Sequence, residues 1–298
     1  MSRKLIYLIN PVSGTREKDS LTRLIKDKTS AAGLPFEILP TVASGDYTFL
    51  KEKILEENIT DIVICGGDGS VNQVVYALAG MKVQFGIIPM GSGNGLALAA
   101  GIPRLLTKAM DVVFAGHSKK IDAFMVNEQF ACMLCGLGFD AAVAHEFALQ
   151  PKRGLKTYAG LTTKRFFSAS TYSFTVEANN LRFDAEAYFV SIANSNQFGN
   201  NFTIAPEANL SDGLLDIVIV KKTVKPMLLW NVLQQVMAGK TKKIENSLQS
   251  AVIYFQTDKL LITNNSQAPI HIDGEPKETI EALNIAVLPD YFQLIQPL

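Results

Sequence analysis

The sequence predicts an N-terminal doubly wound parallel α/β domain and a C-terminal antiparallel, β-sandwich-like domain with helical insertions, with a cleft between them. The first third alternates short apolar runs with segments of helical periodicity, the pattern of a parallel sheet covered by helices. After about Ile121, short β-like runs follow one another between Asn, Asp and Gly turns, as in sandwiches and barrels. A chain of 298 residues is also long enough for about two domains.

Four apolar runs in the first third are expected to be strands, each followed by a helical segment. The third run is apolar and β-branched in its middle, which is typical of a strand covered by helices on both faces. Ser44 or Asp46 is a candidate cap for the helix after the second run. The expected strands are 5–9, 36–39, 61–65 and 85–88.

The remainder is expected to be mostly antiparallel strands, interrupted by two stretches of helical character, 141–164 and 226–238. No internal repeat or low-complexity segment is visible. The expected strands are 130–134, 171–177, 186–193, 214–220, 251–256, 260–263, 270–273 and 282–288.

Composition excludes several classes of protein. The 28 basic and 28 acidic side chains balance, which argues against a general nucleic-acid binder. With 48% hydrophobic and only 19% charged residues the chain is not disordered, and its apolar runs are far shorter than the ~20 residues of a membrane span. Three cysteines are an odd number and indicate a reducing, cytoplasmic setting. Cys132 and Cys135 form a CxxC motif that could bind metal, but no second pair accompanies it.

Three glycine-rich turns follow expected strands of the first domain, at 10–14, 66–70 and 91–95. Because the strands are parallel, the turns should open toward one edge of the sheet. Glycine lets backbone N–H groups approach an anion, and each following helix adds its positive end. A phosphate cradle is therefore expected, although tight turns alone would also need glycine. No Walker or dinucleotide fingerprint is present.

Asp68 is unusual because a carboxylate in an anion-binding turn repels phosphate. It could meet Mg²⁺ carried by a nucleotide, or a hydroxyl that is to be activated. The alternative is that Asp68 caps the helix that begins near Ser70.

Two acidic turns lie in the second domain. Asp273-Gly274-Glu275 could place a carboxylate that accepts a proton from an attacking hydroxyl, or it could be a plain hairpin turn. His271, on the same strand face as Asp273, is expected to face a neighbouring strand. Asp212, with adjacent carbonyls, could bind a hard cation, or its loop could be an ordinary turn before a strand.

Five motifs, taken in order, resemble the diacylglycerol kinase catalytic-domain family, which includes bacterial soluble lipid kinases, sphingosine kinases and ceramide kinases. The resemblance covers essentially the whole chain. It implies transfer of a phosphoryl group from ATP, with Mg²⁺, to a lipid hydroxyl. The motifs are Asn10-Pro11-Val12-Ser13-Gly14, Gly66 to Asn72, Pro89 to Ala97, Asp212 to Asp216 and Asp273 to Glu275.

The resemblance also implies roles for single residues. It implies that Glu275 is the proton acceptor. Asp68 matches the position at which other branches of the family place substrate activation, and Asp273 is also implied to be catalytic. A structural Mg²⁺ is implied at Asp212, Asn209 and Leu214. The implied nucleotide-binding residues are Asn10, Pro11, Val12, Ser13, Gly14, Thr41, Gly66, Gly67, Asp68, Gly69, Ser70, Val71, Asn72 and Ser92.

With these roles, 1–120 is expected to be the nucleotide-binding domain, on which the tail 289–298 could pack, and 121–288 the lipid-substrate domain. The expected partner is a lipid at a membrane surface, with no nucleic acid; a homodimer and peripheral contact with the inner membrane surface are compatible. A basic amphipathic stretch is the candidate membrane element, with a solvated helix face as the alternative. Its residues are Lys152, Arg153, Leu155, Lys156, Tyr158, Leu161, Lys164 and Arg165.

Three alternatives bear on substrate and activity. Ser92 to Ala97 is closer to the sphingosine-kinase form of its motif than to the Thr-containing bacterial form, so the acceptor lipid is left open. An NAD kinase would carry a similar Gly-Gly-Asp-Gly turn. A nucleotide sensor without catalysis could have kept the same cradle.

Overall fold

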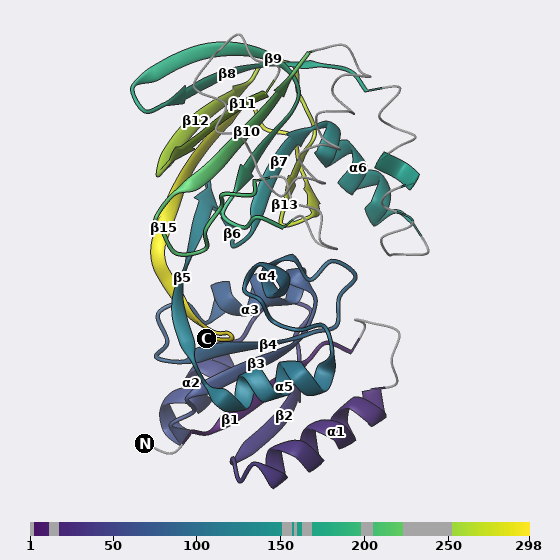
Figure 1. Cartoon of the computed structure of the whole chain (residues 1–298), viewed down its shortest axis with the longest axis vertical. Coiled ribbons are helices and arrows are strands. Elements are labelled where there is room, and N and C mark those ends of the chain that lie inside the picture. The colour runs from purple at the N-terminus through teal and green to yellow at the C-terminus, as the bar shows by residue number, and fades with distance from the viewer. Residues whose placement is uncertain are drawn as a thin grey trace. The chain divides into compact units, whose positions relative to one another are not determined.

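The computed structural model describes residues 3–11, 18–150, 157, 160–162, 169–197, 205–222 and 252–298 (Figure 1). The chain divides into two compact units, Met1–Ile121 with Asp290–Leu298, and Asp122–Pro289. The division falls inside two strands, β5 (Ser118–Val126) and β15 (Ala282–Ile295), which contribute to both units. Within the described ranges, no helix combines the length and apolar character that crossing a membrane requires.

The first unit contains a parallel sheet in the order β2-β1-β3-β4-β15. The chain leaves β1 to one side to form β2 and returns on the other side to form β3. The carboxyl ends of β1 and β3 therefore lie at the point where strand order reverses, which is where open α/β sheets bind ligands. The strands are β1 (Leu5–Ile9), β2 (Phe36–Pro40), β3 (Asp61–Gly66) and β4 (Gln84–Pro89).

Helices cover this sheet, as the alternating pattern predicts. On one face, Ile25 of α1 and Met110 of α5 pack in a single cluster with Tyr7 of β1. β1 is buried at every position, which explains why it carries no charged residue. The helices are α1 (Lys18–Ala31), α2 (Thr48–Glu57), α3 (Asp68–Ala77), α4 (Gly95–Ala99) and α5 (Leu106–Ala115).

The start of α2 differs in detail from the prediction. Tyr47, not Ser44 or Asp46, is the N-cap residue, and its side chain makes no cap hydrogen bond. Asp46 instead lies one position earlier, and its carboxylate accepts from the Thr48 N–H at 2.9 Å. The side chain thus satisfies an N–H of the first turn from outside the helix.

The second unit is antiparallel, in the order β14-β13-β7-β9-β8-β12-β15, with β10 between β9 and β11. α6 (Phe139–Ala148) follows β7 directly. The fold class predicted from the pattern, a parallel α/β part followed by a sandwich-like β part, is confirmed. The strands are β6 (Gln129–Ala131), β7 (Leu134–Gly138), β8 (Tyr172–Ala178), β9 (Leu181–Ala193), β10 (Leu215–Lys221), β11 (Val252–Thr257), β12 (Lys259–Asn264), β13 (Ile270–Ile272) and β14 (Glu275–Lys277).

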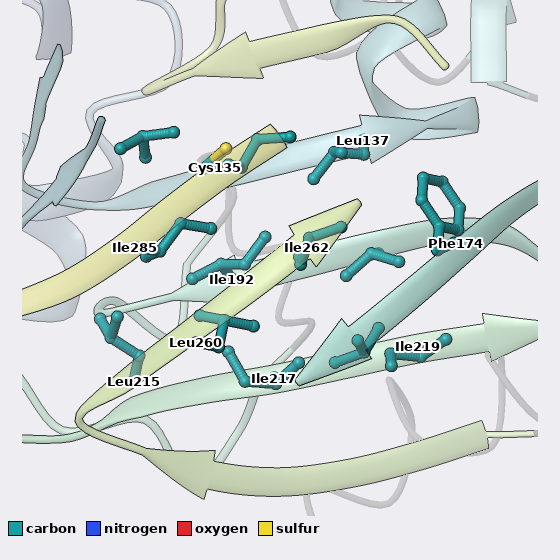
Figure 2. Close-up of a cluster of buried hydrophobic side chains, with 14 of the residues drawn as sticks. Cys135, Leu137, Phe174, Ile192, Leu215, Ile217, Ile219, Leu260, Ile262 and Ile285 are labelled. Carbon is teal, nitrogen blue, oxygen red and sulfur yellow. The ribbon is translucent and has the colours of Figure 1, made fainter. Parts of the chain in front are cut away.

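Aliphatic side chains from most of these strands share one core (Figure 2). Ile192 of β9 and Ile217 of β10 lie in the same cluster as Ile262 of β12, and all three are fully buried. Their neighbours in sequence point to the other face of the sheet, because side chains alternate along a strand. Val218 and Val220 of β10 lie in a second buried cluster, so this strand is covered on both faces.

The expected single strand 130–134 is wrong. The structure has two strands there, β6 and β7, with Cys132 and Met133 between them. The N–H groups of both residues donate to the carboxylate of Asp273, at 2.9 and 3.0 Å, instead of to a neighbouring strand. The stretch 141–164 is helical up to Ala148, in a helix that begins at Phe139. Most of 149–164 lies outside the described residues, as does all of 226–238.

Candidate functional site

The first two glycine-rich turns are tied together at the carboxyl ends of β1 and β3. The Asn10 backbone N–H donates to the Cys65 carbonyl at 3.1 Å, and its side-chain amide donates to Ser70 Oγ at 2.8 Å. A Cβ on Gly66 would lie 2.7 Å from the Ser70 Cβ, closer than real Cβ contacts allow. Glycine is therefore required for Ser70 to reach Asn10.

The second and third turns touch backbone to backbone. A Cβ on Gly91 would lie 2.6 Å from the Cα of Gly67, so no other residue fits there without displacing the chain. The side chain of Asn94, a residue with φ of 55°, closes the third turn by accepting from the Gly91 N–H and donating to its carbonyl, both at 2.8 Å. The second and third predicted turns thus meet at one edge of the sheet, together with Asn10, the first residue of the first turn.

Asp68 connects the second turn with the third. It is the first residue of α3, and the N-cap residue is Gly67, so the helix-capping alternative does not describe its position. Its Oδ1 accepts from the Leu96 N–H in α4 at 3.4 Å. A carboxylate here lies among backbone N–H groups and could contact a cation accompanying a phosphate.

This edge has the chemistry of a phosphate site. α3 is a full helix of 10 residues whose N-cap, Gly67, has no side chain to cap it, and its positive end opens at the turn. Where the second and third turns meet, Gly67 and Gly91 present backbone without side chains. A nucleotide's phosphate groups fit such a set of donors.

The remaining residues that were predicted to bind the nucleotide differ in burial and in their distance from the turns' edge of the sheet. Thr41 is half-buried just after β2 and donates its N–H to the Ile9 carbonyl at 3.0 Å, at the same sheet edge. Ser92 is exposed in the third turn, whereas Val71 points into the core with 2% of its surface exposed. Pro11 is exposed after β1, Gly69 and Asn72 are half-buried in α3, and Val12, Ser13 and Gly14 lie outside the described residues.

In the second unit, Asp273-Gly274 is the turn of a two-residue hairpin between β13 and β14, where Ile272 pairs with Glu275. Asp273 has φ of 49° and Gly274 of 81°, as a type I′ hairpin turn requires. The prediction that Asp273-Gly274 forms a hairpin turn is therefore confirmed. This turn is compatible with a chemical role for Glu275, the residue that follows it. Glu275 is exposed, 3.9 Å from Lys277 Nζ.

Asp273 is bound to the backbone before β7. Only 6% of it is exposed, and its two oxygens accept from the N–H groups of Cys132, Met133 and Leu134 at 2.9 to 3.0 Å. The Cys132 thiol contacts the same carboxylate at 3.4 Å. These bonds give Asp273 a structural task, which is to hold the hairpin turn against the 132–134 segment.

The three cysteines are buried and free. Burial, followed by the nearby Asp140 and Asp273 carboxylates, raises the pKa of the Cys135 thiol well above its ordinary value. A thiol with a raised pKa is a poor nucleophile and a poor metal ligand at neutral pH. In the described part of the chain, no group of three His, Cys, Asp or Glu side chains could hold a metal ion.

The loop before β10 gathers oxygen atoms. Asp212 Oδ1 accepts from the Leu214 N–H at 3.1 Å, and Asn209 Oδ1 accepts from the Ser211 N–H at 3.2 Å. Burial and the neighbouring Asp122 raise the pKa of the Asp212 carboxyl. A cation would relieve that repulsion, and a carboxylate oxygen is the kind of ligand that a hard ion such as Mg²⁺ takes.

Sequence reasoning missed two buried carboxylates. Asp122, 1% exposed, fixes the Asp212 loop by accepting from the Gly213 N–H at 2.7 Å. Asp140, 6% exposed at the start of α6, faces His271. The only sequence signal was an aspartate inside or next to an otherwise apolar run. Of the predicted membrane element, Leu161 is described and lies on a short helical segment, while the charged members are outside the described residues.

Two family models match the chain and together cover nearly all of it. The diacylglycerol kinase catalytic domain matches residues 4–126, and the YegS C-terminal NAD kinase beta sandwich-like domain matches residues 134–296. The second match alone spans more than half of the sequence.

Similar proteins agree with these matches. A diacylglycerol kinase of Staphylococcus carnosus is 26% identical over 92% of this chain and 89% of its own. The "Probable lipid kinase YegS-like" protein of Shewanella frigidimarina is 29% identical over 85% and 82%. A diacylglycerol kinase structure from Bacillus anthracis has the same fold, with a TM-score of 0.72 and 20% identity over 99% of this chain and 97% of that one.

Proposed function

The chain belongs to the diacylglycerol kinase catalytic-domain family, and on that premise we propose that it is an ATP-dependent lipid kinase. It would transfer the γ-phosphoryl group of ATP to the hydroxyl group of a lipid of the diacylglycerol or sphingosine type. The observation that carries the proposal is the meeting of the second and third glycine turns with Asn10 at the carboxyl ends of β1, β3 and β4, with Gly67 and Gly91 in backbone contact.

Phosphoryl transfer depends mainly on positioning and on neutralising charge. Backbone N–H groups of the turns and the N-terminus of α3 would hold the phosphates of ATP. A Mg²⁺ ion would supply charge neutralisation between the phosphates, where Asp68 offers a carboxylate. The bridging bond from the γ-phosphorus to the leaving oxygen breaks, and ADP departs as the lipid oxygen bonds to phosphorus.

Glu275 would accept the proton that the lipid hydroxyl loses in this step. It is exposed on β14, and within the described residues it forms an ion pair with the ammonium of Lys277 at 3.9 Å, which is weak enough to leave the carboxylate available. Asp68 is the second candidate base, but its Oδ1 is already bonded to the Leu96 N–H. A second Mg²⁺ at Asp212, Asn209 and Leu214 would have a structural role.

The acceptor is tested by ADP release from Mg-ATP in mixed micelles of single lipids. The panel contains diacylglycerol, sphingosine, ceramide, monoacylglycerol and phosphatidylglycerol, with NAD as the soluble alternative. Phosphorylation of at least one lipid is expected. Turnover of NAD alone would replace the proposal by a nucleotide kinase, and ATP binding without turnover of any acceptor would replace it by a nucleotide sensor.

The phosphate site is tested by Gly91→Ala, whose Cβ would meet the Cα of Gly67 at 2.6 Å. We expect the KM for ATP to rise about tenfold or more, since the turn must shift by more than the tolerance of a productive geometry. Gly86→Ala is the matched control, because its Cβ would press on Val113 at 3.0 Å inside the same β4 layer. If both variants have the same KM for ATP, the glycine turns do not hold the phosphates.

The base is tested by Glu275→Gln and Asp68→Asn. Glu275→Gln should lower kcat by about 10²-fold to 10⁴-fold, the usual contribution of a general base, with little change in the KM for ATP. Unchanged turnover of Glu275→Gln, together with loss in Asp68→Asn, would move the role to Asp68.

We also propose that the lipid is met at a membrane surface. Sedimentation with liposomes that contain increasing fractions of anionic lipid tests this, because basic side chains add about 1 kcal/mol each near such a surface. Binding that is the same for neutral and anionic liposomes would refute the basic stretch as the contact.

A further inference from the structure

Two sets of contacts hold the turn of the hairpin that carries Glu275, besides the pairing of β13 with β7. In the first, Asp273 binds the backbone of Cys132, Met133 and Leu134. The second involves the peptide between Asp273 and Gly274, whose N–H donates to Nδ1 of His271 at 3.3 Å. Only Gly274 separates that peptide from Glu275, so the orientation of the peptide helps to set the direction in which Glu275 leaves the turn.

This contact fixes the tautomer of His271. Because a backbone N–H can only donate, Nδ1 of His271 must be the unprotonated nitrogen, and Nε2 carries the proton. Nε2 lies 3.5 Å from Oδ2 of Asp140. Oδ2 is buried and accepts no hydrogen bond from the described residues, so the Nε2–H of the imidazole is the charged or polar group that lies within reach of it. A carboxylate beside an imidazole N–H is the arrangement that fixes ring orientation and tautomer in many catalytic sites.

Asp140 and His271 are interior residues, 6% and 2% exposed. Asp140 Oδ1 accepts from the Ala141 N–H at 2.8 Å, so Oδ1 is held within the first turn of α6 and Oδ2 is left to face the ring. A buried carboxylate and a buried imidazole are costly to desolvate without such partners. Their retention in the interior therefore calls for a task that an apolar pair could not perform.

Gly136 makes room for the pair. It lies on β7 in register with His271 on β13, and a Cβ at Gly136 would overlap both Asp140 Oδ2 and His271 Nε2. A second link joins the same helix and strand, since Nε2 of His145 bonds to the Ile270 carbonyl at 2.7 Å. α6 therefore holds β13 at two positions, but only His271 continues to the turn.

We propose that His271 and Asp140 are positioning residues: Nδ1 of His271 holds the Gly274 peptide, and Asp140 holds the imidazole in the tautomer that this bond needs. Through that peptide they orient the carboxylate of Glu275. This inference rests on the proposed function of Glu275 as proton acceptor.

Two substitutions of His271 test the roles of its two ring nitrogens separately. In His271→Asn the amide oxygen lies near the place of Nδ1 and can still accept from the Gly274 N–H. In His271→Gln the amide reaches the place of Nε2 and Asp140, but no acceptor remains for Gly274. We expect kcat of the Gln variant to fall about 10-fold to 100-fold, as when a partner that orients a functional side chain is removed, with an unchanged KM for ATP. The Asn variant should stay within about threefold of the unsubstituted protein.

His145→Gln is the matched control, because it cuts the other link between α6 and β13 and does not touch the turn. Its melting temperature should fall while kcat is kept. If His145→Gln slows turnover as much as His271→Gln, a loosened hairpin explains the result and the positioning role is overturned.

Orientation is also measured without any substrate. Hydrogen exchange of the Gly274 amide, and the N–H residual dipolar couplings of Gly274 and Glu275, should change in His271→Gln and not in His271→Asn. Equal values in the two variants would overturn the proposal, as would altered couplings with unaltered turnover. If the unsubstituted protein phosphorylates no lipid, the proposed function fails, whereas the couplings still decide whether His271 orients the peptide.

Discussion

Replacing Asp273 by Ala tests whether this carboxylate is structural, as its bonds indicate, or catalytic, as the family resemblance implies. The substitution leaves three buried N–H groups, of Cys132, Met133 and Leu134, without acceptors. Each such loss costs about 1–3 kcal/mol, and Ala at φ of 49° adds about 1 kcal/mol. Water that enters the opened turn can accept from some of these N–H groups and so reduces the total cost. We therefore expect local destabilisation of about 4 kcal/mol.

Asp273→Asn should cost much less. Its amide oxygen can still accept from Met133 and Leu134, and Asn tolerates the left-handed backbone conformation. Only the amide nitrogen is mismatched, because it faces the donor N–H of Cys132. We expect a local loss of about 1–2 kcal/mol.

Pulsed alkylation of the buried thiols measures the opening of this region, since a thiol reacts only when it is exposed. A loss of 4 kcal/mol corresponds to about a 10³-fold faster reaction of Cys132 in Asp273→Ala, against about tenfold in Asp273→Asn. Cys65, buried in the other unit, is the internal control and should not change. If Asp273→Ala alkylates Cys132 at the original rate and yet loses turnover, the carboxylate acts in the chemistry and the structural reasoning is refuted.

Three further predictions concern other sites. Asp61→Ala should destabilise the first unit by about 3–5 kcal/mol in chemical denaturation, because it removes the fully buried carboxylate that Arg3 contacts at 2.6 Å and leaves the guanidinium charge with backbone carbonyl partners alone; a loss below 1 kcal/mol would contradict this. Burial raises the pKa of Tyr7 to about 12, so the unfolded state loses its phenolic proton first as pH rises above 10. Stability is therefore constant below pH 10 and falls between pH 10 and 12, on the order of 3 kcal/mol for this group; Tyr7→Phe should lack that part of the decline in alkaline denaturation, and parallel curves would count against it. Millimolar Mg²⁺ should raise the melting temperature of the unsubstituted protein and not that of Asp212→Asn. Equal shifts of the two melting temperatures would show that Mg²⁺ does not bind at the Asp212 loop.

The features that depend on local sequence were predictable. Each glycine turn at the end of a first-unit strand could be located because an apolar run, a Gly-rich segment and a helical period succeed one another along the chain. The Asp-Gly hairpin between Ile272 and Glu275 is equally local, since two residues of positive φ are what a type I′ turn requires. The fold class and the family were both recovered on this basis.

Features that depend on distant partners were not predictable. The break between β6 and β7 arises because Asp273, far along the chain, takes the N–H groups of residues 132–134. The pairing of Asp140 with His271 likewise depends on strand register across Gly136. The residue roles implied by the family, Glu275 above all, stay predictions until turnover is measured.

The last strand of the first unit has a consequence for the order in which the protein is built. Gln293 and Leu294 of β15 pair with β4, and Leu294 is fully buried. Domains generally fold as units while the chain is being synthesised, the N-terminal one first. Here residues 1–121 leave the ribosome without the strand at the edge of their sheet, and that strand appears only after all of Asp122–Pro289 has been made. The unit whose synthesis begins first is therefore completed last, because the edge strand of its sheet comes from Asp290–Leu298, beyond the whole of the second unit.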